Sequence, residues 1–244
     1  MGDDTQQVRV HFGKPFPLFP LDGVVLLPHA MVRLFIFEPR YRQMLESVLD
    51  NAGQIAMAVY DDDGWHAGES QPPLRDAVCI GQVVQHERMP DGNYRVWMQG
   101  VCRARIVEEE APEGDRLYRR AMLQPLEVQR QEIDPTLDDA RDELIELLAE
   151  GPCAELPSVR ALLEQLKDED ADVAAIAPDV LFEIVGLSVV GALDRRGLLY
   201  RLLAEGDPIE RARSVLTELR HVHALMKRAE PQFDPEAPQG VSWN

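Results

Sequence analysis

Few side chains in this 244-residue chain combine the residue types and the spacing that catalysis requires. Cys102 and His86 are a candidate nucleophile and general base, because a strand pairing could bring the thiol and the imidazole together. A simpler interpretation places Cys102 in the core, as a small residue on the apolar face of a strand. We prefer the simpler interpretation and expect no catalytic residues.

Two groups resemble metal ligands in composition only. His221 and His223 lie two residues apart, and side chains at this spacing on a helix do not share a face. The three aspartates at 61–63 resemble the start of a calcium loop, but Pro72 stands where such a loop needs a bidentate glutamate. We therefore expect no metal and no cofactor, and we interpret the aspartates as part of a solvated loop.

Cysteine usage and the character of the N-terminus bear on the compartment. The three cysteines are odd in number and lack metal-site spacing, which favours a reducing environment over a disulfide framework. The N-terminus is acidic and polar, with no apolar signal region. The longest uncharged apolar stretch, between Glu183 and Asp194, is shorter than the roughly 20 residues that cross a bilayer. We expect a cytoplasmic protein with no membrane partner.

The chain is strongly acidic, with a formal net charge of −18. Residues 1–130 carry 14 basic and 19 acidic side chains, whereas residues 131–244 carry 11 and 24. An acidic surface repels phosphate backbones, so the charge disfavours nucleic acid as a partner. A local cluster of positive charge is distinctive on such a protein.

An apolar stretch over residues 16–45 organises the first half of the chain. Residues 32–37 are rich in β-branched and aromatic side chains, which predicts a strand. Pro39 then opens a predicted helix, because a first-turn proline lacks only an N–H that the helix does not use. Apolar residues recur behind it at helical spacing: Tyr41, Leu45 and Val48.

Residues 94–107 show the cleanest alternation of apolar and polar side chains, which predicts a long strand. The Pro-Asp-Gly-Asn sequence at 90–93 predicts a hairpin between this strand and one at 78–88. Gly100 predicts a bulge or a bend in mid-strand. One face is expected to hold Tyr94, Val96, Met98, Cys102, Ala104 and Ile106, and the other Arg95, Gln99, Arg103 and Arg105. Further strands are expected over 54–60 and 117–128.

The pattern changes to helical spacing after residue 130. Helices are expected from Thr136, over 159–166, from Pro178, over 193–203 and over 208–228. Asp207 is the expected cap of the last helix. The apolar face of this helix comprises Ile209, Ala212, Leu216, Leu219, Val222 and Met226. Strands followed by helices argue for the α+β class. We expect a leader at 1–15, a β-rich domain at 16–130, a helical bundle domain at 131–230 and a tail at 231–244.

Several blocks of the sequence resemble one known family. They are PLFPL at 17–21, Pro28, FEPRY at 37–41, PDG at 90–92, GVCRARI at 100–106 and Tyr118. These blocks resemble the Lon N-terminal domain, the LON substrate-binding region of the ATP-dependent Lon proteases. The resemblance spans most of residues 16–228, and it implies a PUA-like β pseudo-barrel followed by an α-helical bundle.

The resemblance implies binding without catalysis. Lon proteases also carry an ATPase and a Ser-Lys peptidase, but this sequence has no Gly-x-x-x-x-Gly-Lys-Ser/Thr motif and no serine motif near its three lysines. We therefore expect a free-standing, non-enzymatic module that engages unfolded or exposed segments of protein clients. The alternative is an RNA-binding adaptor, because PUA-like barrels elsewhere bind RNA. The net charge and the lack of a basic-aromatic stripe oppose that alternative.

Candidate contact residues lie at the start of the helix that begins at Pro39. The Arg-Tyr-Arg run at 40–42 combines two residue types that are enriched at binding hot spots, although Tyr41 could instead pack into the barrel. Glu38 meets the helix dipole, and a strand arginine could hold its carboxylate, either as a structural brace or within a binding face. The candidate protein-binding set is Glu38, Arg40, Tyr41, Arg42, Arg103 and Arg105.

Overall fold

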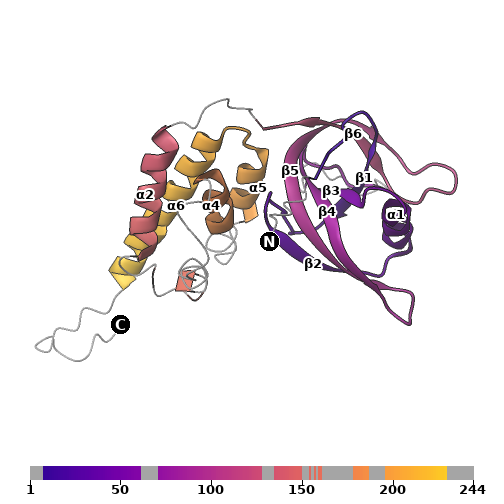
Figure 1. The fold of residues 1–244 in the computed structure, drawn as a ribbon, viewed down its shortest axis with the longest axis horizontal. Coiled ribbons are helices and arrows are strands. Elements are labelled where there is room, and N and C mark those ends of the chain that lie inside the picture. The colour runs from indigo at the N-terminus through magenta and orange to yellow at the C-terminus, as the bar shows by residue number, and fades with distance from the viewer. Residues whose placement is uncertain are drawn as a thin grey trace, which may run out of the picture.

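The structure is a computed structural model that describes residues 8–61, 71–127, 135–149, 154, 157, 159–160, 178–186 and 196–229. Figure 1 shows a curved sheet that carries helix α1 (Pro39–Leu49), with a group of further helices beside it. The described strands lie between residues 16 and 125, and the described helices other than α1 lie between 135 and 229. The expected mixed α and β class is therefore confirmed.

Six strands form one sheet: β1 (Phe16–Leu21), β2 (Met31–Ile36), β3 (Gln54–Val59), β4 (Ala77–Arg88), β5 (Tyr94–Glu110) and β6 (Arg120–Pro125). Their order is β2-β5-β4-β3-β1-β6, and β6 also pairs with β5, so five of the strands form a closed ring. The β1–β3 pair is parallel, and the other pairs are antiparallel. Among the described strands β2 pairs only with β5, so its other edge has no partner strand.

The predicted hairpin joins β4 to β5. The amide of Met89 donates to the carbonyl of Asn93 over 2.8 Å, and the amide of Gly92 donates to the carbonyl of Met89 over 2.9 Å. The side chain of Asp91 accepts a further hydrogen bond from the amide of Asn93 over 3.0 Å. These bonds set the register in which β4 and β5 begin to pair.

Gly100 marks a shift of register in the middle of β5, where the sequence predicts a bulge. Gly81 of β4 pairs with Gly100, whereas the preceding Ile80 pairs with Cys102, so β5 contains one extra residue. A Cβ atom on Gly100 would lie only 2.0 Å from the carbonyl oxygen of Leu27. Glycine is therefore needed for the close approach of these two backbones.

The bulge changes which residues of β5 share a core. Buried residues before it pack with α1 in one hydrophobic cluster, whereas Ala104 beyond it packs in a second cluster. The prediction that one apolar face runs from Tyr94 to Ile106 is wrong, because an inserted residue reverses the alternation. Arg103 lies opposite the buried Cys79, and it too is buried instead of lying on an exposed polar face.

Helix α1 packs on the sheet through one face and on a loop through another. Its buried residues are Tyr41, Met44, Leu45 and Val48. The side-chain amide of Gln43 donates to the carbonyl of Asp115 over 2.6 Å, and its oxygen accepts from the amide of Leu117 over 2.8 Å. Both attachments fix the position of the helix start.

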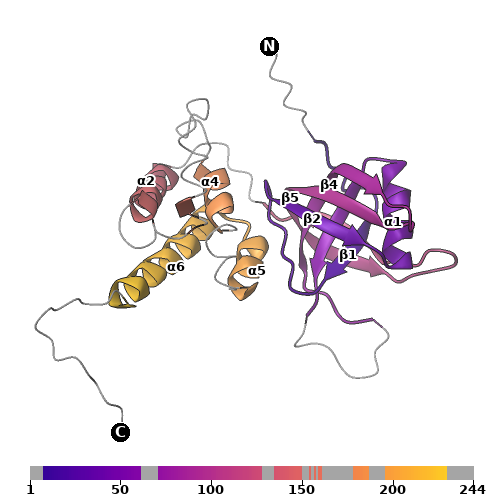
Figure 2. The ribbon, with the colours of Figure 1, turned by 90° about the horizontal axis from the view of Figure 1, so that it is seen from below.

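The other helices are α2 (Pro135–Ala149), α4 (Pro178–Val185), α5 (Arg196–Ala204) and α6 (Pro208–Ala229), which lie together beside the sheet in Figure 2. Helix α6 is capped as the sequence predicts, since the amide of Ile209 donates to the Asp207 side chain over 2.9 Å. The buried residues of its expected apolar face are Ala212, Leu216, Leu219 and Val222. Helices α2 and α4 pack against α6.

Two further expected segments lie partly or wholly outside the described residues. Of the helix expected over 159–166, only residues 159–160 are described, and the expected tail at 231–244 lies outside the described residues. No helix in the described ranges is long and apolar enough to cross a membrane.

Candidate functional site

The candidate residues at 38–42 form a local cluster at the start of α1. Arg40 Nε donates to Glu38 Oε2 over 2.9 Å, and the Arg40 guanidinium lies 4.4 Å from the centre of the Tyr41 ring. The Arg40 and Glu38 side chains are 46% and 39% exposed. An exposed ion pair of this kind contributes only about 0–1 kcal/mol. Arg40 is therefore a cation that a partner can reach at little cost to the fold.

Tyr41 anchors this cluster and offers little contact surface of its own. Its side chain is buried, its ring centre lies 4.5 Å from that of Phe19, and its hydroxyl donates to the carbonyl of Pro20 over 3.3 Å. Burial raises the pKa of Tyr41, and the neighbouring Tyr60 adds to this effect. The buried ring acts as a positioning residue that holds Arg40 at the surface.

The structure does not form the predicted brace between Glu38 and a strand arginine. The partner of Glu38 among the described residues is Arg40. Arg105 is exposed on the part of β5 that lies opposite Ala77, beyond the bulge. Arg103 pairs with other carboxylates. The predicted brace is therefore wrong, because the bulged β5 directs its arginines elsewhere.

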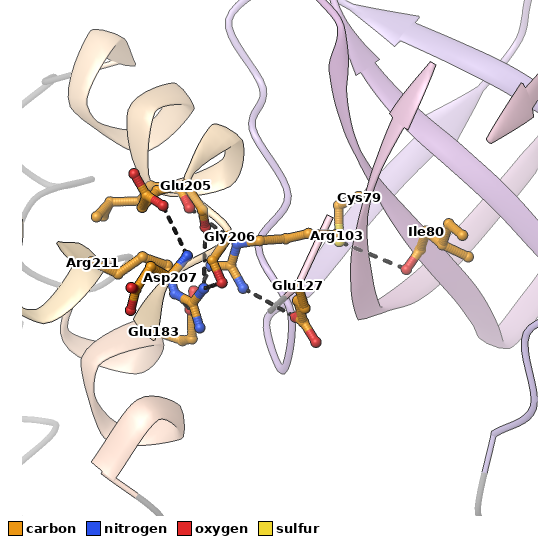
Figure 3. Close-up of polar contacts among 10 residues, drawn as sticks. Cys79, Ile80, Arg103, Glu127, Glu183, Glu205, Gly206, Asp207 and Arg211 are labelled. Atoms are coloured by element: carbon orange, nitrogen blue, oxygen red, sulfur yellow. Dashed lines mark hydrogen bonds and ion pairs between the residues drawn. The ribbon is translucent and has the colours of Figure 1, made fainter. Parts of the chain in front are cut away.

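Arg103 lies where the sheet meets the helices, and Figure 3 shows its side chain reaching from β5 toward them. It is 1% exposed and forms ion pairs with Glu183 of α4 and, over 3.4 Å, with Glu127. Its Nε also donates to the carbonyl of Leu202 in α5 over 3.0 Å. A side chain buried in this way offers no surface to a partner protein.

We call this contact region the joint, and its residues are Ala77, Arg103, Leu126, Glu183, Tyr200, Gly206 and Arg211. Glu183 also pairs with Arg211 of α6 over 3.0 Å, so one buried carboxylate serves two arginines. The amide of Ala77 donates to the Tyr200 hydroxyl over 3.0 Å. A Cβ on Gly206 would lie 2.2 Å from the carbonyl oxygen of Leu126, which shows how tightly the two parts pack.

Beside the α1 cluster lies an exposed apolar strip that the sequence pattern alone does not single out. Met31, Phe35 and Phe37 are 56%, 52% and 59% exposed, and the two phenylalanine rings stack with their centres 6.1 Å apart. Residues at alternate positions of a strand share a face, so the phenylalanines two apart were the available signal. We call Met31, Arg33, Phe35 and Phe37 the β2 strip.

Two hollows flank α1. One of about 180 Å³ lies beside Arg40, Tyr41 and Tyr60. The other, of about 710 Å³, lies near the C-terminal end of the helix and is lined in part by His11 and Arg120. Together with the β2 strip, the first hollow gives the helix start both apolar and cationic surface. We call Glu38, Arg40, Arg42 and the β2 strip the outer face.

The described residues form neither the candidate pair of Cys102 and His86 nor a metal site. His86 lies opposite Val96 and Cys102 lies opposite Ile80, so the register keeps the imidazole and the thiol apart. Burial raises the pKa of Cys102 to about 11, which keeps the thiol protonated at neutral pH. Within the described ranges no group of three His, Cys, Asp or Glu side chains could hold a metal ion. Asp62 and Asp63 lie outside those ranges.

Comparison with known proteins shows a family. Residues 15–221 match the family described as the ATP-dependent protease La (LON) substrate-binding domain. The Lon protease of Trichlorobacter lovleyi is 23% identical over 215 residues, covering 86% of this chain and 24% of that protein. The Lon proteases of Azorhizobium caulinodans and Escherichia coli K12 are 30% identical over 97 and 93 residues, covering 38% and 37% of this chain. The matches span only 11–24% of the length of these relatives.

Solved structures show the same fold. The N-terminal domain of the Mycobacterium avium complex Lon protease superposes with a TM-score of 0.56 at 17% identity, covering 86% of this chain and 100% of that one. A Lon N-terminal domain protein from Xanthomonas campestris superposes with a TM-score of 0.53 at 20% identity, covering 84% and 98%. With residues 15–221 matched to the family, this chain belongs to the LON substrate-binding domain family.

Proposed function

We propose that this chain recognises unfolded or exposed segments of client proteins and does not act on them chemically. The family match over residues 15–221 carries the proposal, because the family is described as the substrate-binding domain of a protease. The outer face supports it with exposed phenylalanines beside exposed arginines on an acidic protein. Exposed apolar patches mark interaction sites, and aromatic and arginine side chains dominate binding hot spots.

The proposed contact set is narrower than the residue pattern suggests. Arg40 and Arg42 supply positive charge beside the β2 strip, and Glu38 holds Arg40 in place. Tyr41 contributes through Arg40, whose guanidinium lies over its ring. Arg105 is exposed but lies beyond the bulge, so we regard it as a separate contact candidate.

The finer architecture and setting are also part of the proposal. The closed ring of strands supports a PUA-like pseudo-barrel, and the packing of α2 and α4 on α6 supports a helical bundle. We propose a domain boundary near residues 129–136, which limited proteolysis should cut before either core. We further propose that the module is cytoplasmic.

A binding titration tests the function. The probe is a fluorescently labelled, reduced and carboxymethylated protein that cannot refold, and the matched control is the same protein in its folded state. We expect saturable binding to the unfolded probe alone, at both low and high salt. A structured RNA that binds instead, with affinity falling steeply as salt rises, would favour the RNA-binding alternative. Absence of binding to the unfolded probe would overturn the proposal.

The non-enzymatic part is tested on the same preparation. We expect no ATP hydrolysis and no degradation of casein, because the sequence holds neither a phosphate-binding loop nor a Ser-Lys peptidase motif. Turnover that persists through purification and disappears in a single point variant would contradict this expectation.

A further inference from the structure

We propose that the free edge of β2 binds an extended client segment as an added strand. The segment would carry apolar side chains at alternate positions, with an acidic side chain opposite Arg33. This inference rests on the proposed function and specifies how a client is held. Strand addition is an established mode of peptide recognition, in which main-chain hydrogen bonds give affinity and alternate side chains give specificity.

The backbone of β2 has groups available for such a strand. The amide of Gly100 donates to the carbonyl of Ala30 over 2.8 Å, which makes these two residues a hydrogen-bonded pair. Met31, the next residue along the chain, therefore belongs to a non-hydrogen-bonded pair with β5. Because such pairs alternate with hydrogen-bonded ones, the N–H and C=O groups of Met31, Arg33 and Phe35 point away from β5. In the described part of the chain, no backbone group outside β5 bonds to these three residues.

The same residues also present their side chains to solvent. Met31, Arg33 and Phe35 are exposed, whereas Val32 and Leu34 between them pack against the core. Backbone direction and side-chain direction both alternate with a period of two, so one set of residues offers both kinds of contact. Figure 2 shows β2 on the side of the sheet that faces the viewer. A client strand placed there would lay its alternate side chains beside the β2 strip.

Charge selects the residue expected at the centre of the client segment. Arg33 has no ion-pair partner among the described residues, whereas Arg95, which lies opposite Phe35, pairs with Glu87 over 3.6 Å. An unpaired guanidinium between two apolar side chains fits a carboxylate between two apolar side chains. The expected client segment therefore reads apolar, acidic, apolar at every second position.

The same charge argues against a second copy of this chain as the occupant. Symmetric antiparallel pairing of two β2 strands about their centres would bring the two Arg33 side chains opposite each other. Like charges directly opposite on paired strands are destabilising. A client with an acidic residue avoids this repulsion, and the strip is therefore better suited to a client than to self-association.

The first test uses a short labelled peptide with Phe, Asp and Phe at alternate positions and threonine between them. Two further versions carry backbone N-methyl groups. In one version the methyl groups are on the amides of Phe, Asp and Phe, and in the other they are on the amides of the threonines. Only one set can face β2 in an added strand, so we expect one version to lose at least about 10-fold in affinity and the other to stay within about 2-fold. Equal loss, or no loss, in both versions would overturn the inference.

The second test changes the protein. Phe35→Ser should weaken binding of the peptide, and Arg33→Glu should weaken it while binding a version with Lys in place of Asp. Val107→Ser is the matched control, since Val107 is 55% exposed on β5 and lies outside the strip. We expect it to bind the peptide as the parent protein does.

The outcomes separate this inference from the proposed function. If the unfolded protein probe binds, and Phe35→Ser and Arg33→Glu bind it as the parent does, the β2 inference falls and the function stands. If neither probe binds the parent protein, both fall. Sedimentation that shows a dimer in the parent and a monomer in Phe35→Ser would assign the strip to a second copy, and this also overturns the inference.

Discussion

Arginines at the joint and arginines on the outer face lie in opposite environments. At the joint, Arg103 and Arg211 are 1% and 6% exposed and converge on the buried carboxylate of Glu183. On the outer face, Arg40 is 46% exposed, and its ion-pair partner among the described residues is the nearby Glu38 at the start of its own helix. A buried charge needs its partner, whereas an exposed charge is solvated with or without one.

This difference assigns the two groups of arginines to different tasks. Removing one partner of a buried pair leaves an uncompensated charge, so the joint residues hold the sheet and the helices together. Exposed arginines cost little to move or to pair anew, so the outer face can exchange water for a client. The same residue type is thus structural in one region and available for binding in the other.

The largest expected effect is at the joint. Glu183→Ala leaves Arg103 and Arg211 without their shared carboxylate and should lower the free energy of unfolding by about 3–5 kcal/mol. Urea denaturation followed by circular dichroism measures this loss. The matched control is Glu210→Ala, which removes an exposed pair with Arg213 and should cost less than about 1 kcal/mol. Similar small losses in both variants would erase the contrast between the two regions.

A second change separates loss of the joint from loss of the helical core. Leu219 of α6 is fully buried, and Leu219→Ala should cost about 2–5 kcal/mol. Leu216→Ala falls in the same range, because Leu216 is also buried. Leu225 lies on the same helix but is 46% exposed, so Leu225→Ala serves as the control. A cost below about 1 kcal/mol at both buried leucines would mean that this face of α6 serves a partner.

The reactivity of the thiols of Cys79 and Cys102 tests whether these two side chains are shielded from water. Burial raises the pKa of Cys79 despite the neighbouring Arg103, and it raises the pKa of Cys102 to about 11. At pH 8 we expect Cys102 to be alkylated about 100-fold more slowly than a thiol of ordinary pKa near 9. Mass spectrometry after timed alkylation, with and without urea, measures the rates at each site. Fast modification of the folded protein would contradict the burial.

The raised pKa of Cys102 makes the free energy of unfolding depend on pH. Between about pH 9 and 11 the Cys102 thiol is still protonated in the folded chain but ionised in the unfolded chain. The unfolded state therefore binds fewer protons in this range. The contribution of this thiol to stability is therefore complete below about pH 9 and declines as the pH rises toward 11. Cys102→Ala should flatten this decline in a series of urea titrations.

The smallest expected effect is on the outer face. Arg42 is half-buried beside the hairpin turn, and Arg42→Ala should change the free energy of unfolding by less than about 0.5 kcal/mol. The melting temperature should shift by no more than a few degrees, while binding of the unfolded client weakens. Arg40→Ala is the companion variant. If both variants lower the melting temperature sharply and leave client binding unchanged, these arginines are structural and the contact site lies elsewhere.

Local signals in the sequence determined most of the elements. Pro39 in the first turn predicts α1, the Asp-Gly turn predicts the β4–β5 hairpin, and Gly100 predicts the bulge in β5. Asp207 and the apolar face behind it predict α6. These predictions hold because caps, turns and hydrophobic periodicity act over a few residues.

The tertiary structure decided what each charged or apolar surface residue does. Arg103 reads as an exposed strand arginine in the sequence, yet its partner Glu183 lies 80 residues further along the chain. Alternation predicts that Phe35 and Phe37 share a face, but only the sheet order shows that β2 is an edge strand. Sequence periodicity indicates which residues lie on the same side of an element. Which segment covers that side depends on contacts between distant parts of the chain, and burial follows from those contacts.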